Sequence, residues 1–453
     1  MTETEYLFDL LKAGVSPVHV VLSCERRLKE AGFTRIYYED PWELVPGGRY
    51  YMVHHDTTLF AFTLGEETAA AAQPEAAVLQ GTKATAQPEA SARRGSRAPL
   101  IRMAAAHTDF PCLRIKPSPD VTSNGYAQVN VEVYGGAILN TWLDRPLGVA
   151  GRIAVRGENP FEPRVIPYVS EKSLLTIPNL AIHMNREVNK GVELNKQTDL
   201  LPVAALLTEE QKEGDFLSWL AEEISVPKED ILDYELTVYC REEPEFTGLH
   251  DEFISAPRLD NLTSCAALVS AIISAKQTNG IRLIALFDHE EIGSRTKQGA
   301  GSLLLHDLLL RILSETGKEK EAQRDLYQSM LLSVDVAHAT HPNQPGKTDL
   351  TNKPVPGRGV CIKEASAQSY ATDCEAVAIV QQICAAGNIP YQRFVNRSDI
   401  PGGGTLGAIA SALVPAKTVD IGVPMLAMHS ARELMGRADQ EALAALVKEF
   451  FVR

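Results

Sequence analysis

From residue 256 onward, apolar segments of strand length alternate with longer amphipathic segments of helix length. Parallel strands need long crossover connections, so an alternation of this kind predicts a mostly parallel sheet covered by helices on both faces. We therefore expect a doubly wound α/β domain. The pattern predicts strands over residues 282–287, 330–336, 392–395 and 418–423, and helices over residues 264–276, 303–315, 374–386, 405–413 and 439–450.

The preceding chain divides into segments of different character. Residues 5–32 have apolar side chains at helical spacing, interrupted near Pro17, and predict one or two helices, whereas residues 50–63 and 100–106 predict strands. Residues 65–98 are mainly Ala, Gln, Pro, Glu and Ser, which predicts a flexible surface insertion between two strands, with a binding arm as the alternative.

Residues 117–248 are rich in turn residues and do not continue the alternation. We interpret them as a β-rich domain inserted into a discontinuous α/β domain made of residues 1–116 and 249–453. No repeat period is visible, which disfavours a solenoid.

The charge and cysteine content restrict the partners. The 453 residues carry a formal net charge of −14, which disfavours nucleic acid and anionic membranes as partners because both require a basic surface. A local cation could still bind acidic substrates. The seven cysteines are irregularly spaced without a CxxC pair, which indicates reduced thiols. With no basic leader and no run of eighteen apolar residues, we expect a cytoplasmic protein.

Polar side chains stand at the ends of the predicted strands, where open α/β sheets bind ligands. Alone, each has an ordinary structural explanation: a His-x-Asp is usually a surface turn, and an Asp before a helix is usually an N-cap. Together they supply imidazole nitrogens and carboxylate oxygens, a set that suits zinc, manganese or cobalt. These residues are His107, Asp109, Asp260, Glu290, Glu291, Asp335 and His429.

Two histidines and three carboxylates exceed the four ligands of one tetrahedral zinc. A two-metal site bridged by Asp260 accommodates all five and leaves room for water. Glu290 is then a spare carboxylate beside the ligand Glu291, and hydrolysis requires such a group as a general base.

The ordered motifs resemble those of the aspartyl aminopeptidase family. The main ones are HTDFPCLR at 107–114, PRLDNL at 257–262, HEEIGS at 289–294, SVDVAHA at 333–339 and MHSARE at 428–433. Further matching segments lie at 16–19, 141–145, 177–183 and 399–405. The resemblance covers nearly the whole chain except the insertion, and it implies a zinc exopeptidase fold with an inserted oligomerisation domain.

The resemblance implies a cytoplasmic enzyme that hydrolyses the N-terminal residue from peptides with two zinc ions per subunit, for which manganese or cobalt can substitute. It makes His107 and Asp335 ligands of one metal, Glu291 and His429 ligands of the other, and Asp260 the bridge. Glu290 becomes the base that takes a proton from the water between the metals. Asp109 would hydrogen-bond the far nitrogen of His107 and fix its tautomer.

The family pattern also concerns the substrate and the assembly. It implies that His183 reaches a neighbouring subunit's active site, in a dodecamer built from dimers; the alternative is a core histidine. Lys363, His338 and His341 are the expected substrate-binding residues, with Lys363 favouring an Asp or Glu at the first position. Residues 364–370 lack the asparagines and arginine of the eukaryotic members, so a broader or neutral preference is the alternative.

Two other functions compete with this interpretation. One is another dizinc amidohydrolase of the same clan, such as a deacetylase or carboxypeptidase, although these lack the inserted domain. The other is a non-catalytic, self-assembling scaffold, which would have no reason to retain the unpaired carboxylate of Glu290.

Overall fold

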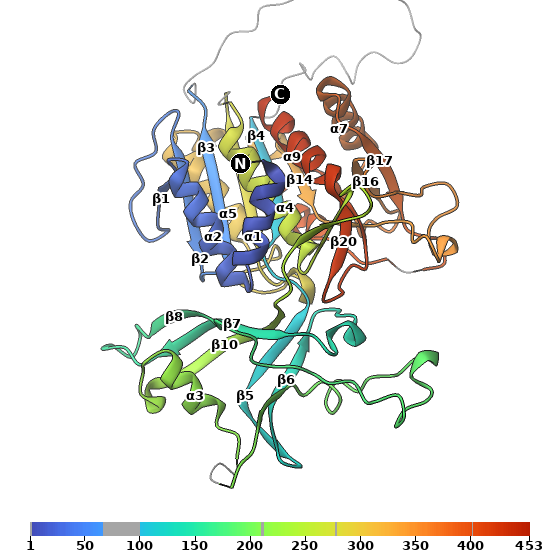
Figure 1. The fold of residues 1–453 in the computed structure, drawn as a ribbon. Coiled ribbons are helices and arrows are strands. Elements are labelled where there is room, and N and C mark those ends of the chain that lie inside the picture. Colours follow the sequence, from blue (N-terminus) through green and yellow to red (C-terminus); the bar gives the residue numbers. More distant parts are fainter. Residues whose placement is uncertain (1, 67–99, 210–212, 277–278, 401) are drawn as a thin grey trace, which may run out of the picture.

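The structure, a computed structural model, describes residues 2–66, 100–209, 213–276, 279–400 and 402–453 (Figure 1). The insertion predicted at 65–98 lies almost entirely outside these residues. The described chain contains a nine-stranded, a six-stranded and a five-stranded sheet. The nine-stranded sheet and most helices form one lobe, and the six-stranded sheet forms a second lobe (Figure 1).

The nine-stranded sheet confirms the expected mostly parallel α/β architecture. Five of its eight neighbouring strand pairs are parallel, including the central run β13, β4, β14 and β18. In spatial order the strands are β1 (Thr34–Arg35), β2 (Arg49–His54), β3 (Thr58–Leu64), β13 (Ile281–Phe287), β4 (Ile101–His107), β14 (Met330–Val334), β18 (Lys417–Gly422), β16 (Val360–Glu364) and β17 (Tyr391–Val395).

Helices cover both faces of this sheet. On β4, Ala104 and Ala106 pack into one apolar core, while Met103 and Ala105 pack into another, because successive side chains of a strand point to opposite faces. The first core includes side chains of α1 (Glu3–Ala13), α2 (Pro17–Glu30), α4 (Leu259–Ser274), α7 (Cys374–Gly387) and α9 (Arg437–Val452). The second includes α5 (Leu304–Glu315), α6 (Ala322–Tyr327) and α8 (Leu406–Leu413). None of the helices within the described ranges is long and apolar enough to cross a bilayer.

The six-stranded sheet is entirely antiparallel and lies mostly within the segment predicted to be β-rich. It occupies residues 112–240, so its ends fall a few residues before the predicted limits of 117 and 248. In spatial order its strands are β8 (Arg164–Val169), β7 (Leu147–Val155), β10 (Ile231–Cys240), β5 (Cys112–Ser123), β6 (Tyr126–Tyr134) and β9 (Val203–Leu206), and helix α3 (Phe216–Glu223) contacts β5.

The five-stranded sheet, which the sequence analysis did not predict, joins segments far apart in the chain. It brings the segment before α4 beside the last strand, with Ala256 paired to Glu433. Its strands are β11 (Glu245–Thr247), β12 (Phe253–Ala256), β20 (Glu433–Gly436), β19 (Pro424–Leu426) and β15 (Ala337–His338).

The predicted elements agree with the structure to within a few residues, with two informative differences. α4 begins at Leu259 instead of 264, but Asp260 and Asn261 have non-helical backbone angles, so the regular helix starts after them. The strand predicted over 330–336 ends at Val334, which leaves Asp335 at the sheet edge.

Candidate metal centre

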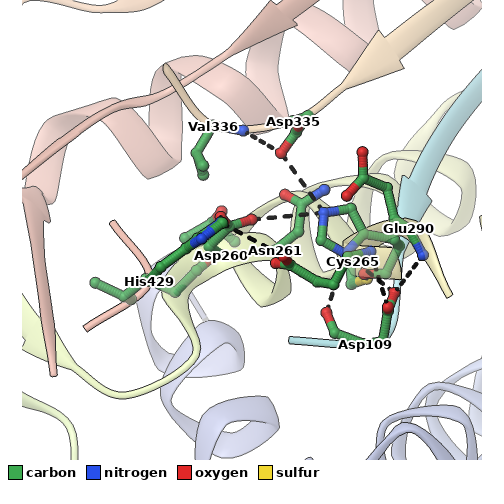
Figure 2. Close-up of polar contacts among 12 residues, drawn as sticks. Asp109, Asp260, Asn261, Cys265, Glu290, Asp335, Val336 and His429 are labelled. Carbon is green, nitrogen blue, oxygen red and sulfur yellow. Dashed lines mark hydrogen bonds and ion pairs between the residues drawn. The ribbon is translucent and has the colours of Figure 1, made fainter. Parts of the chain in front are cut away.

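The predicted ligands meet at the carboxyl edge of the nine-stranded sheet (Figure 2). His107 is the last residue of β4 and Asp335 follows β14, while Glu290 and Glu291 lie in the 3₁₀ turn η4 (Glu290–Ile292) after β13. Because β13, β4 and β14 are parallel neighbours, their ends coincide. Two loops bordering the five-stranded sheet complete the cluster: Asp260 is the second residue of α4, and His429 lies between β19 and β20.

Asp260 lies between the two histidines, with one oxygen toward each. Its Oδ1 is 3.5 Å from Nε2 of His107, and its Oδ2 is 3.3 Å from Nε2 of His429. The outer carboxylates complete two groups: Asp335 Oδ1 is 3.6 Å from Nε2 of His107, and Glu291 Oε2 is 3.5 Å from Nε2 of His429. The potential ligand atoms of each group lie within 4.8 Å of one another.

These separations fit bound cations better than direct hydrogen bonds. The four nitrogen–oxygen distances exceed the usual hydrogen-bond range, but two atoms that share a tetrahedral zinc at about 2.1 Å lie about 3.4 Å apart. In addition, Asp260 Oδ1 and Glu291 Oε1 are buried without a hydrogen-bond partner among the described residues. A buried carboxylate oxygen without compensation is costly, and a cation removes that cost.

Without a bound cation, the protein shifts the pKa values of several residues in this cluster away from their ordinary values. Burial raises the pKa of Glu290 to about 8, with the negative charges of Asp335 and Asp109 adding to the effect. Burial lowers the pKa of His429, but Asp260 and Glu291 outweigh it and bring the pKa to about 10. Burial also lowers the pKa of His107, but the contacts with Asp109 and Asp260 outweigh it, so the pKa of His107 is raised. Bound cations act against these shifts, because they stabilise carboxylates and neutral imidazoles.

Asp109 organises the site mainly through backbone groups. Its carboxylate accepts the N–H groups of Glu290 and Glu291, each at 3.1 Å, and the hydroxyl of Tyr134 at 2.8 Å. Nδ1 of His107 lies 3.0 Å from the main-chain carbonyl of Asp109 and 3.4 Å from its Oδ1. The far nitrogen of His107 therefore contacts the main chain of Asp109 more closely than its carboxylate, and the carboxylate anchors the turn that carries the predicted base.

The end of β6 also contacts the centre, which the sequence analysis missed. After Tyr134, the carbonyl of Gly136 lies 3.2 Å from Nδ1 of His429. A Cβ at Gly135 would lie 3.2 Å from Cβ of Glu291, and a Cβ at Gly136 would lie 3.1 Å from Nδ1 of His429. The adjacent glycines Gly135 and Gly136 were the one sequence feature that could have predicted this contact, since glycines after a strand can mark a close approach of the backbone to another group.

The predicted substrate residues have different environments. Lys363 is buried, with 3% exposure; it donates to the carbonyl of Val336 at 2.7 Å and lies 3.6 Å from Asp335 Oδ2. His338, on β15, and His341 are exposed. His183 is exposed in the loop between β8 and β9, which excludes the alternative of a core histidine.

A mixed α/β sheet with a buried cluster of imidazoles and carboxylates at its strand ends, accompanied by an additional carboxylate, is the arrangement of a metal-dependent hydrolase. Comparisons with known proteins narrow this class. A profile of the family described as "Aminopeptidase I zinc metalloprotease (M18)" matches residues 10–78 and 94–451.

Several known proteins are similar to this chain in sequence or in fold. A probable M18 family aminopeptidase 2 from Clostridium acetobutylicum is 39% identical over 448 residues, covering 98% of this chain and 97% of the relative. One from Pseudomonas aeruginosa is 38% identical over 449 residues, with the same coverage. The structure also resembles Ape4, solved in complex with Nbr1, with a TM-score of 0.87, 32% identity, and coverage of 99% of this chain and 85% of that one. It shares its fold with an M18 aminopeptidase from Thermotoga maritima, with a TM-score of 0.82, 22% identity, and coverage of 99% and 95%.

The chain belongs to the M18 family of zinc aminopeptidases. The expected zinc exopeptidase fold, metal-dependent aminopeptidase activity and zinc requirement are thus confirmed at the level of the family.

Proposed function

We propose that this aminopeptidase uses two metal ions bridged by Asp260. His107 and Asp335 would complete one site, and Glu291 and His429 the other. The position of Asp260 carries the proposal, because its two oxygens face the two histidines at 3.5 and 3.3 Å. Zinc is the metal of the family, and manganese or cobalt are proposed substitutes.

We assign Glu290 as the general base and acid. When bound, the two ions would polarise the first peptide carbonyl and lower the pKa of the attacking water. The Glu290 carboxylate, half-buried beside Glu291, takes the proton of that water and later returns it to the leaving amine. Its backbone N–H is held by Asp109 at 3.1 Å, which fixes the turn during this transfer.

The proposed substrate is a peptide with a free α-amino group, which the cluster of buried carboxylates attracts. We propose that Lys363 stabilises the carboxylate of Asp335 and does not bind the substrate, because its ammonium is buried and already donates a hydrogen bond to the carbonyl of Val336. A broad or neutral preference at the first position then follows, with the Asp or Glu preference as the alternative. His338 and His341, both exposed, remain proposed contacts for the substrate.

We further propose a cytoplasmic dodecamer built from dimers. The neighbours include oligomeric aminopeptidases, among them a yeast mApe1 dodecamer whose TM-score to this chain is 0.78 at 23% identity. All seven cysteines are free, as expected in a reducing compartment. In this assembly His183, on its exposed loop, would reach the active site of a neighbouring subunit.

The test is cleavage of aminoacyl-p-nitroanilides with Asp, Glu, Leu or Lys at the first position by the zinc-loaded wild type, Glu290→Gln and a matched control, Glu30→Gln, on the surface of α2. We expect Glu290→Gln to lose at least about 10³-fold in kcat while it retains its metal. Asp109 and Glu433, two further carboxylates beside the ligands without a ligand role, already accept hydrogen bonds from backbone N–H groups. The control should match the wild type.

The outcomes separate the competing functions. Cleavage of acylated amino acids without cleavage of the nitroanilides would favour another hydrolase of the clan. No cleavage of any substrate by the metal-loaded wild type would favour the scaffold. Full activity in Glu290→Gln would refute the assignment of the base.

A further inference from the structure

Glu433 is a buried carboxylate that contacts two metal-ligand residues through their backbones. It is the first residue of β20 and is 2% exposed. Its Oε2 accepts the N–H of Asp260 at 3.0 Å, and its Oε1 accepts the N–H of His429 at 2.7 Å. Each oxygen is therefore used by a different ligand residue, and the two residues come from loops about 170 positions apart in the chain.

The two loops need such an anchor because their backbones are in unfavourable conformations. Arg258, just before Asp260, has φ +61°, and Ala427 and His429 have φ +56° and +67°. Non-glycine residues in this region are strained and persist only where the surroundings hold them. The N–H groups of Asp260 and His429 would also lack these partners without Glu433, and a buried unpaired N–H is itself costly.

We propose that Glu433 is a positioning residue of the metal centre that holds the bridging ligand Asp260 and the terminal ligand His429 in a fixed relation. The inference rests on the two-metal site proposed above. Glu433 does not contact the reacting atoms; it acts through the two backbones that it bonds.

The proposed role is specific for one of the two metals. The site formed by Asp260, Glu291 and His429 contains both residues that Glu433 holds, whereas the site formed by His107, Asp260 and Asp335 contains only the bridge. Removal of one acceptor should therefore weaken the first site more than the second.

The substitution Glu433→Gln tests this role with little change in volume. An amide offers one acceptor oxygen and places an NH₂ donor against the second N–H, so only one of the two bonds can form. Glu433→Asp, which keeps the charge but shortens the side chain, is the second variant. The matched control is Asp439→Asn, because Asp439 is also a buried carboxylate that accepts two backbone N–H groups, from Gly357 at 2.6 Å and Gly359 at 2.8 Å, neither of which is a ligand.

The measurement is a titration of metal-free protein with Co²⁺, followed by its visible absorption, together with thermal unfolding of the metal-free forms. The wild type should bind two equivalents. For Glu433→Gln we expect one equivalent to bind about 10- to 100-fold more weakly while the other changes less than about threefold. Glu433→Asp should recover part of the loss, and Asp439→Asn should unfold at a lower temperature but bind both equivalents like the wild type.

The outcomes distinguish the inference from the proposal on which it rests. One equivalent bound by the wild type would refute the two-metal site itself. Two equivalents in the wild type with unchanged affinities in both Glu433 variants, or an equal loss at both sites matching that of Asp439→Asn, would refute the positioning role alone.

Discussion

At the scale of single residues, Lys363 shows how the neighbours of a buried ammonium determine its charge and its role. Burial alone would lower the pKa of its ammonium, but Asp335 and other acidic neighbours prevail and raise it, so the side chain remains charged. The ring of Tyr370 lies 4.8 Å from its Nζ and adds a favourable cation–π contact. The ammonium is thus held on several sides by the protein.

We predict that Lys363→Met lowers metal affinity about 10- to 100-fold at the site containing Asp335, because a ligand loses its outer partner. At saturating metal, kcat/KM should fall to a similar extent with Asp, Glu and Leu at the first position. Steady-state kinetics on the nitroanilide panel checks this, with Lys228→Met on the surface of the six-stranded lobe as the control. A loss confined to the Asp and Glu substrates would instead assign Lys363 to the substrate pocket.

The composition of the candidate centre was predictable because its side chains stand directly after apolar strands in the sequence. His107, Glu291 and Asp335 could be inferred in this way, since the ends of parallel strands converge. The contacts of Asp109 and Glu433 with backbone N–H groups could not be inferred. They depend on how loops bend, and a backbone donor carries no residue-specific signal.

At the scale of elements, the sequence patterns were most informative for the long helices and strands from α4 onward and least informative for short strands. The alternation predicted α4, α5, α7, α8 and α9 and the strands β13, β14, β17 and β18, but the short helix α6 and β16, which runs antiparallel to β18, were missed. Five residues between turn-rich loops give too short a pattern to reveal a strand or its direction. The five-stranded sheet was missed for the same reason, because its strands have only two to four residues.

Helix α2 has a titratable group at its N-terminus. Ser16 precedes the helix but makes no side-chain capping bond; its Oγ lies 2.8 Å from Nδ1 of His19. Burial lowers the pKa of His19 to about 4. The fold therefore favours the neutral imidazole, and this contribution to stability is complete above the ordinary pKa of about 6.5 and is lost as the pH falls toward 4.

We predict that the wild type loses about 2 kcal/mol more stability than His19→Gln between pH 7 and pH 4.5, a figure reduced for the partial exposure of the ring. Thermal unfolding of both proteins across this range measures the difference, and protonation of the metal ligands cancels because both share it. His306→Gln, on α5, serves as the control. Parallel pH profiles for the wild type and His19→Gln would contradict the prediction.

At the scale of the whole molecule, the loop between β8 and β9 has the character of an intersubunit contact. Next to His183, the side chains of Leu180, Ile182 and Met184 are 53%, 52% and 74% exposed. Adjacent apolar side chains on an exposed loop indicate a surface that another protein covers. In the homo-oligomer proposed above, a second copy of this chain is the expected partner.

We predict that His183→Ala lowers kcat at least tenfold with unchanged metal content, because each active site would lose a group supplied by its neighbour. Subunits of His183→Ala and Glu290→Gln, co-expressed to form mixed oligomers, should regain activity, since some sites then combine an intact base with an intact histidine. Activity assays of the co-expressed pair against each variant alone test this, with His250→Ala as the control. An absence of recovery in verified mixed oligomers would show that each subunit works alone.

Strand β6 belongs to the six-stranded sheet, yet three successive residues at its end touch the metal centre: Tyr134 bonds Asp109, Gly135 lies against Glu291, and the carbonyl of Gly136 lies beside His429. The lobe outside the nine-stranded sheet thus forms one wall of the centre. A displacement of this lobe would therefore move groups that contact Asp109, Glu291 and His429. If a subunit of the proposed oligomer docks on this lobe, we expect a subunit released from the oligomer to hold its ions less firmly.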